Sequence, residues 1–257
     1  MIDLFADRLG MAIQGGVHTL DAITGTSGPD TLDGTAGDDV IRGRGGGDLI
    51  DGHEGDDSID GGDGNDSVQG GLGHDTIFGG LGDDTLMGAN GDDAADQSGE
   101  SIDGGDGNDS IVGSLAGDVL IGGDGNDAIE VAGADTAHGG AGADTIGGLF
   151  TPLRPFAGAE AYGEDGDDQI FLVGSATKGG PGCTVDGGAG DDTVGFGVFG
   201  KGAGGSQVSG GEGDDELFGA GRSNDTLDGG GGFDTISYGR LLHAVTFDLT
   251  TGLASSK

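Results

Sequence analysis

The chain has few of the side chains that build an ordinary globular core. It contains no tryptophan, two tyrosines and four prolines among 257 residues, and its 66 glycines contribute no side chain. A large conventional core is therefore excluded, because bulky apolar residues are too scarce to fill it. The same composition is typical of flexible linkers, so composition alone leaves a disordered chain open as an alternative.

Positive charge and long apolar runs are also scarce. Nine Lys and Arg residues face 47 Asp and Glu residues, which gives a formal charge of −38. This charge repels phosphate backbones and anionic membrane surfaces, so we expect no nucleic-acid partner and look for cations instead. No run of about 18 apolar residues predicts a membrane span. The opening MIDLFADRLGMAIQ is too acidic for a secretory signal, and the lone Cys183 cannot form an internal disulfide.

The most regular feature of the sequence is a period of nine residues. Eight consecutive frames run from Gly25 to Asp96, and eight more begin at Gly104, Gly113, Gly122, Gly139, Gly163, Gly187, Gly210 and Gly229. The fourth position is Gly in every frame except one, which has Ala116, and the sixth is always Asp. The eighth position is Leu, Ile or Val except at Ala95. A disordered linker has no reason to keep three positions in phase over so many copies, so the repeat predicts a solenoid.

Weaker frames fill most of the gaps between the regular ones. Residues 16–24, 131–138 and 220–228 keep an acidic residue at the expected place, whereas three others offer Glu100, Cys183 and Ser206 there. Two stretches break the phase, residues 148–162 and a shorter one at 196–200. Pro152 and Pro155 predict that the first is an inserted loop.

Each frame predicts a turn followed by a short strand. Six residues rich in Gly, Asp and Asn favour the turn, and three residues around the aliphatic eighth position favour the strand. Such short strands need neighbours, so successive frames are expected to alternate between two facing parallel sheets, with 18 residues per coil. The expected fold is all-β, a parallel β-roll whose eighth-position side chains meet between the sheets.

This geometry stacks the sixth-position aspartates one coil apart, at about 4.8 Å. Calcium binds oxygen ligands at about 2.3–2.6 Å, so an ion between two coils can accept a carboxylate from each, together with turn carbonyls. Magnesium prefers a tighter octahedron, and zinc prefers nitrogen or sulfur ligands. We therefore predict multiple Ca²⁺ ions, about a dozen or more, bound by Asp30, Asp39, Asp48, Asp57, Asp66, Asp75, Asp84, Asp93, Asp109, Asp118, Asp127, Asp135, Asp144, Asp168, Asp192, Asp215, Asp225 and Asp234.

The pattern G-G-x-G-x-D-x-U-x, where U is aliphatic, is nearly complete in GGDGNDSVQ, GGLGHDTIF and GGDGNDSIV. It resembles the hemolysin-type, or repeats-in-toxin (RTX), calcium-binding family over roughly residues 16–237. The resemblance implies a right-handed β-roll, calcium in the turns on both sides, and an extracellular protein exported by type I secretion as an unfolded chain. The ending GLASSK departs from the uncleaved export signal usual in this family, which favours a fragment or an atypical member.

The expected organisation has five parts. Residues 1–15 form an N-terminal cap or docking segment with a short helix, and 16–147 form the first β-roll block. Residues 148–162 form the inserted loop, 163–237 a less regular second block, and 238–257 a C-terminal strand and cap. Both ends are expected to cover terminal coils, since an uncovered solenoid end exposes its core and its strand edges.

Other motifs are weak, and we expect no catalytic site and no enzyme. GFGVFGKG at 195–202 lacks the Ser or Thr of a phosphate-binding loop, and HEGDD at His53 lacks the second histidine of a zinc protease. The expected function is that of a calcium-binding β-roll module that folds on binding Ca²⁺ after export and acts as an extracellular structural and stabilising module. Two alternatives stay open: a self-assembling matrix, adhesin or surface-layer subunit with homotypic contacts, and the non-catalytic part of a secreted hydrolase or epimerase.

Overall fold

The structure is a computed structural model. It describes residues 21–89, 99–114, 116–147, 158–174, 182–198, 205–219, 225–238 and 246–248. Every regular element in these ranges is a β-strand, and the strands form two parallel sheets. The expected N-terminal helix lies outside the described residues.

Odd-numbered and even-numbered strands separate into the two sheets, which confirms that successive frames alternate between them. The 12-stranded sheet contains β1 (Asp21–Thr24), β3 (Asp39–Gly45), β5 (Ser58–Asp63), β7 (Thr76–Leu81), β9 (Ser101–Asp106), β11 (Val119–Asp124), β13 (Thr136–Ala141), β15 (Glu160–Asp165), β17 (Thr184–Ala189), β19 (Gln207–Glu212), β21 (Thr226–Gly231) and β23 (Thr246–Asp248). The 11-stranded sheet contains β2 (Thr31–Asp33), β4 (Leu49–Glu54), β6 (Ser67–Leu72), β8 (Thr85–Met87), β10 (Ser110–Val112), β12 (Ala128–Glu130), β14 (Thr145–Gly147), β16 (Gln169–Gly174), β18 (Thr193–Val198), β20 (Glu216–Gly219) and β22 (Thr235–Tyr238).

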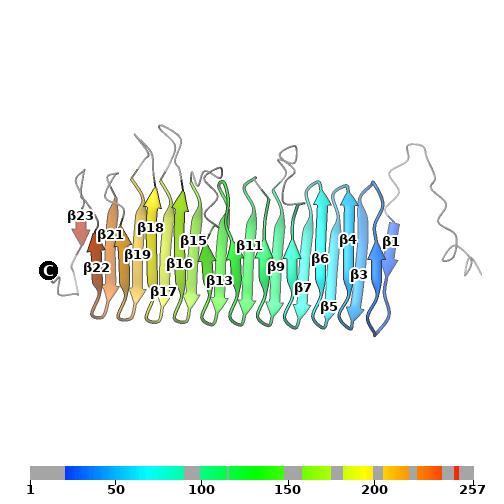
Figure 1. Ribbon diagram of the computed structural model, residues 1–257, viewed down its shortest axis with the longest axis horizontal. Coiled ribbons are helices and arrows are strands. Elements are labelled where there is room, and N and C mark those ends of the chain that lie inside the picture. Colours follow the sequence, from blue (N-terminus) through cyan, green and yellow to red (C-terminus); the bar gives the residue numbers. More distant parts are fainter. Residues whose placement is uncertain are drawn as a thin grey trace, which may run out of the picture.

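The strands stack along one axis in chain order, as Figure 1 shows from β1 to β23. Register follows the repeat: Ile41 pairs with Ile59 and Ile59 with Ile77, so one coil is two frames. The sheets continue from β13 to β15 and from β14 to β16, so the irregular stretch before β15 does not divide the roll. Residues 148–157 of the expected insertion lie outside the described residues, and Glu160–Tyr162 at its end belong to β15.

Most strands are longer than the three residues expected. β5, for example, runs from Ser58 to Asp63 and so includes the first three residues of the next frame. Pairing continues through the glycines, with Gly62 opposite Gly80. Because these glycines reach positive φ without a Cβ clash, they bend the strand towards the turn without ending it.

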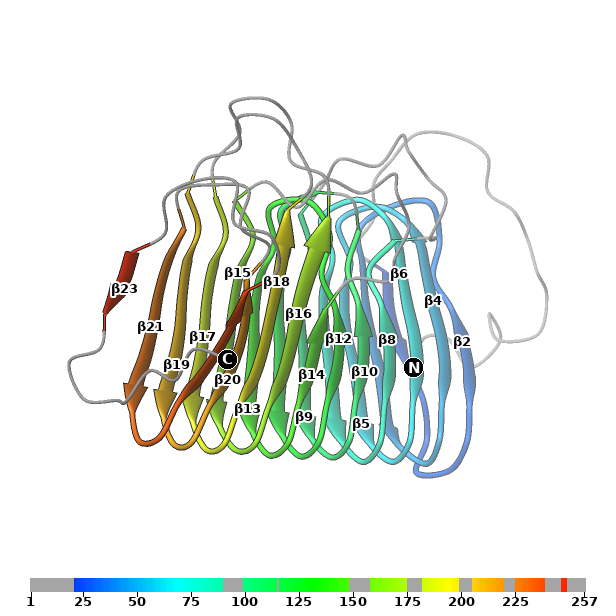
Figure 2. The same ribbon diagram turned by 60° about the vertical axis from the view of Figure 1, so that its left-hand side comes forward.

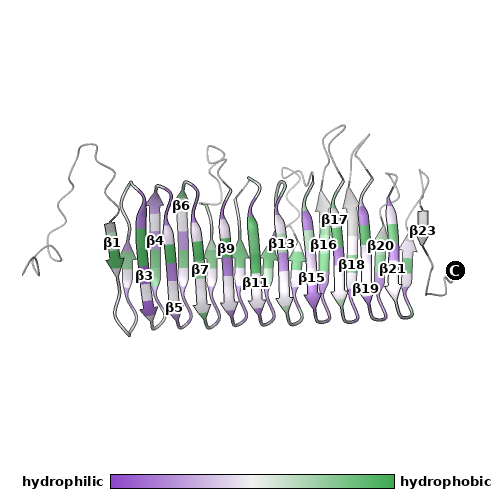
Figure 3. Cartoon of the chain, turned by 180° about the vertical axis from the view of Figure 1, so that it is seen from behind, coloured by the Kyte–Doolittle hydropathy of each residue, from purple (hydrophilic) through white to green (hydrophobic). Residues whose placement is uncertain are grey.

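The core is a double row of eighth-position aliphatics, as the periodicity predicts. Ile41, Ile59, Ile77 and Ile102 are fully buried in one sheet, and Ile50, Leu86 and Ile111 are nearly or fully buried in the other. Neighbours in the same row are paired across adjacent strands. Figure 3 shows hydrophobic colour mainly within the strands. Stacking of like side chains in successive coils therefore replaces the mixed packing of a globular core.

The two edges of the roll differ. Turns that lead from the 12-stranded to the 11-stranded sheet form the tight-turn edge, and after the first of them each spans three residues, as in 46–48 and 64–66. Turns in the opposite direction form the looped edge, where the connections vary widely in length, as at 55–57, 88–100 and 175–183. Figures 1 and 2 show the tight turns aligned along the lower edge. All the irregular stretches of the repeat therefore fall on one edge.

Among the described residues, no helix has the length and apolar character needed to cross a membrane.

Candidate metal sites at the turns

The sixth-position aspartates form a continuous ladder along the tight-turn edge. The backbone N–H of each donates to Oδ1 of the aspartate in the next coil, at 2.8 Å from Asp30 to Asp48 and 2.7 Å from Asp48 to Asp66. The series goes on through Asp84, Asp109, Asp127, Asp144, Asp168, Asp192 and Asp215 to Asp234. One carboxylate oxygen of each rung from Asp48 onward is therefore fixed by the preceding coil.

The second carboxylate oxygen is buried and lacks a hydrogen-bond donor within the described part of the chain. This holds on the tight-turn edge for Oδ2 of Asp48, Asp66, Asp84, Asp109, Asp127, Asp144, Asp168, Asp192 and Asp215, and on the looped edge for Oδ2 of Asp57. These side chains are at most 3% exposed. A buried carboxylate oxygen without a partner costs several kcal/mol, so this many in one series indicates a missing partner.

A backbone carbonyl faces each of these oxygens. A Cβ built on Gly61 would lie 2.5 Å from Asp66 Oδ2 and 2.7 Å from the carbonyl oxygen of Gly79, the first residue of the frame one coil later. The same two kinds of atom meet at the first glycine of nine further frames on this edge, which begin at Gly25, Gly43, Gly79, Gly104, Gly122, Gly139, Gly163, Gly187 and Gly210. Two oxygens thus converge on one point only because the first residue has no side chain.

Burial shifts the protonation of these carboxylates. Desolvation, reinforced by repulsion from neighbouring carboxylates and opposed by the backbone N–H bond, raises the pKa of Asp84 and Asp192 from 3.8 to about 7. The same balance raises the pKa to about 6 at Asp57, Asp109, Asp127, Asp144 and Asp215. The only Lys and Arg residues in the described ranges are Arg42 and Arg44. Neutralisation of the ladder therefore requires protons or external cations.

The looped edge carries a second ladder that starts regularly and then changes. Asp39 donates its N–H to Asp57, and Asp57 to Asp75, at 2.8 and 2.9 Å. Further along, the rungs are Glu100, Asp118, Asp135, Ala159, Cys183, Ser206 and Asp225. The carbonyl oxygen of each of the first six accepts a hydrogen bond from the first backbone N–H of the strand in the next coil, as sixth-position residues do, and Ser206 donates its N–H to Asp225 Oδ1 at 3.1 Å. Cys183 donates its N–H to Ser206 Oγ at 3.0 Å. In the second half of this edge, neutral side chains therefore replace most of the carboxylates.

The ligand atoms fit a hard cation. Carboxylate and carbonyl oxygens meet at the first glycines of the tight-turn edge, and calcium prefers such ligands. In the described ranges no point gathers three or more His, Cys, Asp or Glu side chains. A site here consequently depends on backbone carbonyls as much as on side chains, and the first glycines supply them.

The structure brings together the sequence-predicted residues in these two ladders, except Asp93, which lies outside the described residues. Glu100, Cys183 and Ser206 occupy the sixth position in the looped-edge ladder, as their spacing indicates. Sequence reasoning missed Ala159, because the inserted residues before it hide the frame. It also missed the role of the second residue of each frame, although the sequence shows where that residue is not glycine.

Comparisons with known proteins agree with this geometry. A family model for the RTX calcium-binding nonapeptide repeat matches residues 24–59, 60–94, 97–130, 131–149 and 202–236, more than half of the chain. A search among curated proteins returned no match.

One similar solved structure is the X-ray crystal structure of a hyperactive, Ca²⁺-dependent, β-helical antifreeze protein from an Antarctic bacterium. It is 18% identical with a TM-score of 0.53, over 89% of this chain and 83% of that one. At this identity the likeness concerns the fold alone. The repeat, the parallel β-roll and the family match together show that this chain is a calcium-binding β-roll and belongs to the RTX calcium-binding nonapeptide repeat family.

Proposed function

We propose that calcium ions bind between successive coils, mainly along the tight-turn edge, and that this binding drives folding. The observation that carries the proposal is the series of buried Oδ2 atoms that have no donor in the described part of the chain, each near a glycine carbonyl of the next coil. An ion at each such point supplies the partner that the protein does not, and its two positive charges offset the carboxylates of adjacent rungs.

Folding and binding are one event in this proposal. The core rows contain one aliphatic side chain per nine residues, whereas ordering each residue costs about 1–2 kcal/mol in backbone entropy. Apolar burial is therefore a weak driving force, and the energy of ion binding contributes directly to folding. A chain in a compartment poor in calcium stays unfolded, and the same chain folds where calcium is abundant.

We place this event outside the cell, where the protein acts as a structural and stabilising module without catalytic activity of its own. An unfolded chain of low apolar content suits export through a narrow channel, and folding on arrival prevents its return. Within this proposal, residues 238–257 form the C-terminal cap. The pairing of β23 with β21 supports it, since it continues the sheet beyond the last frame.

A second candidate is a self-assembling extracellular subunit. In the described ranges, β1 and β2 at one end, and β22 and β23 at the other, each pair on one side only. Open parallel edges are templates for another chain. The third candidate, a non-catalytic part of a secreted hydrolase or epimerase, concerns sequence beyond this chain.

Circular dichroism during a calcium titration tests the main proposal. The chain starts in EGTA, and we expect β-sheet signal to appear with calcium and not with magnesium at equal ionic strength. A chain that is already folded in EGTA at neutral pH contradicts the coupling. Electron microscopy of the calcium-loaded protein separates the candidates, because fibres or lattices favour the second and dispersed rods oppose it.

A further inference from the structure

The second residue of each frame divides the repeats into two conformational groups. In the first group this residue has a left-handed backbone, with φ of 108° at Gly62 and 114° at Gly123. Glycine is expected there, because other residues are strained at positive φ. Nevertheless Arg44, His53 and Glu164 occupy the same position with φ of 78–79°. The conformation is therefore a property of the site and not merely of glycine.

Most frames of this first group contain an aspartate whose buried Oδ2 has no donor among the described residues; in the frame of Gly230, with φ of 92°, Asp234 is only partly buried. Arg44, His53 and Glu164 belong to the frames of Asp48, Asp57 and Asp168, and all three Oδ2 atoms are buried without a hydrogen bond in the described residues. The frames of Gly62, Gly80, Gly105, Gly123, Gly140, Gly188 and Gly211 show the same combination.

The second group behaves differently. Thr26 and Thr35 lack the left-handed conformation, and their backbone N–H groups donate to Oδ2 of Asp30 and Asp39 at 2.5 and 2.6 Å. Ser114 donates in the same way to Asp118. Ala132 donates to Asp135 at 2.5 Å in a frame that is one residue shorter. In each case the chain itself supplies a partner to the oxygen that is unpartnered elsewhere.

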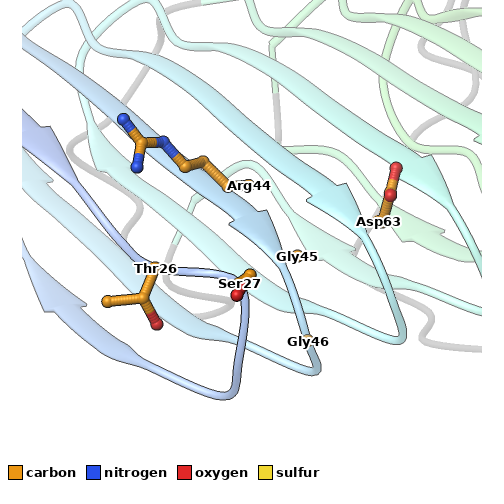
Figure 4. Close-up of a pocket in the computed structure, with 6 residues that line it drawn as sticks. All are labelled: Thr26, Ser27, Arg44, Gly45, Gly46 and Asp63. Atoms are coloured by element: carbon orange, nitrogen blue, oxygen red, sulfur yellow. The ribbon is translucent and has the colours of Figure 1, made fainter.

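The donor that the four frames share is the backbone. The hydroxyl groups of Thr26 and Thr35 also donate to the carboxylate, at 2.9 and 3.0 Å. Ala132 has no hydroxyl, yet its N–H makes the same bond. Figure 4 shows one residue of each group on neighbouring coils, Thr26 beside Arg44, at an open depression of about 530 Å³.

We propose that the backbone conformation of the second residue selects the partner of each aspartate, a calcium ion where it is left-handed and a backbone N–H where it is not. This inference rests on the proposed calcium sites. An N–H and a cation compete for the lone pairs of the same oxygen, so an N–H that folding places there weakens the binding of an ion at that oxygen. Asp30, Asp39, Asp118 and Asp135 therefore match the motif without offering Oδ2 to calcium.

The selection has a structural consequence. Two of the four frames, those of Thr26 and Thr35, make up the first complete coil, and the other two are successive rungs of the looped edge. In these rungs a backbone N–H already binds Oδ2, so we expect them to form at lower calcium concentrations than the rungs of the first group, although Oδ1 of Asp39 is buried without a hydrogen bond in the described residues. Counting aspartates in the sequence overestimates the number of ions.

A matched pair of substitutions at Thr35 tests this. Thr35→Gly removes the barrier to the left-handed conformation, whereas Thr35→Ala removes only the hydroxyl and keeps the N–H bond, as at Ala132. Calcium per chain is measured on the full-length protein by equilibrium dialysis and metal analysis. We expect one additional ion in Thr35→Gly and the parent number in Thr35→Ala. Equal numbers in the two variants would overturn the proposal, whether both match the parent or both exceed it.

A second pair of substitutions compares an aspartate of the first group with one of the second group. Asp66→Asn removes a carboxylate of the first group, and we expect the loss of at least one ion. Asp118→Asn removes one of the second group, and we expect no loss. Loss of an ion in Asp118→Asn contradicts the selection. A parent protein that binds no calcium at all contradicts the proposed function instead, so the two failures are distinguishable.

Discussion

Acid should partly replace calcium in folding this protein. Burial raises the pKa of seven ladder carboxylates above 3.8, to about 7 at Asp84 and Asp192 and to about 6 at the other five. A carboxylate whose pKa is higher in the folded than in the unfolded chain binds more protons when folded. The ion-free fold therefore gains stability as pH falls through 7 and 6, and this gain is complete below 3.8. It is lost again as pH rises through the folded values.

The magnitude follows from these pKa values. Between pH 8 and pH 5, a group that shifts from 3.8 to about 6 adds about 1.4 kcal/mol to stability, and one that shifts to about 7 adds about 3 kcal/mol. The seven groups together give an upper limit on the order of 10 kcal/mol, because neighbouring rungs are not independent. This is comparable with the whole stability of a typical domain.

Far-UV circular dichroism and thermal melts in EGTA between pH 8 and pH 5 measure this effect. We expect β-sheet signal and a melting transition to appear as pH falls, and calcium affinity to fall over the same range. The double variant Asp84→Asn/Asp192→Asn is the control, because its amides stay neutral and its stability should depend less on pH. An ion-free chain that remains unfolded at pH 5, or that melts at the same temperature at every pH, would refute the reasoning.

Three further outcomes are expected. Gly61→Ala places a Cβ against Asp66 Oδ2 and the Gly79 carbonyl, so it should lower the stability of the folded protein by about 1–3 kcal/mol and weaken calcium binding. In the control Gly28→Ala the new Cβ meets nothing within 4 Å, so the melting temperature should change little. Ile77→Ala empties a fully buried core position and should destabilise the calcium-loaded protein by about 2–5 kcal/mol in denaturant unfolding, against a small change for Leu81→Ala, which is 49% exposed. Cys183 is buried and its pKa is raised by burial, so a thiol reagent should label it slowly with calcium and rapidly in EGTA, and equal rates would contradict folding on calcium.

The repeat made the aspartate ladders predictable in outline. A fixed sixth-position aspartate in each nine-residue frame, combined with strands that must pair in parallel, leaves only one way to stack the carboxylates, and Asp57 does lie one coil from Asp75. The spacing also identified Glu100, Cys183 and Ser206 as altered rungs. Ala159 escaped because a rung without a carboxylate, after an insertion of unpredictable length, has no signature in a single sequence.

The sequence by itself determined the period, the two parallel sheets, the aliphatic rows and the acidic edges, because all of these depend on local spacing repeated many times. Only the tertiary structure decided which edge holds an unbroken ladder and which aspartates already have a partner. The second property depends on whether a peptide N–H of the same turn also points at the carboxylate, as it does at Thr35. That choice is made by the backbone conformation of the second residue, which residue type does not fix: glycine permits positive φ, and Arg44, His53 and Glu164 have positive φ although their side chains disfavour it.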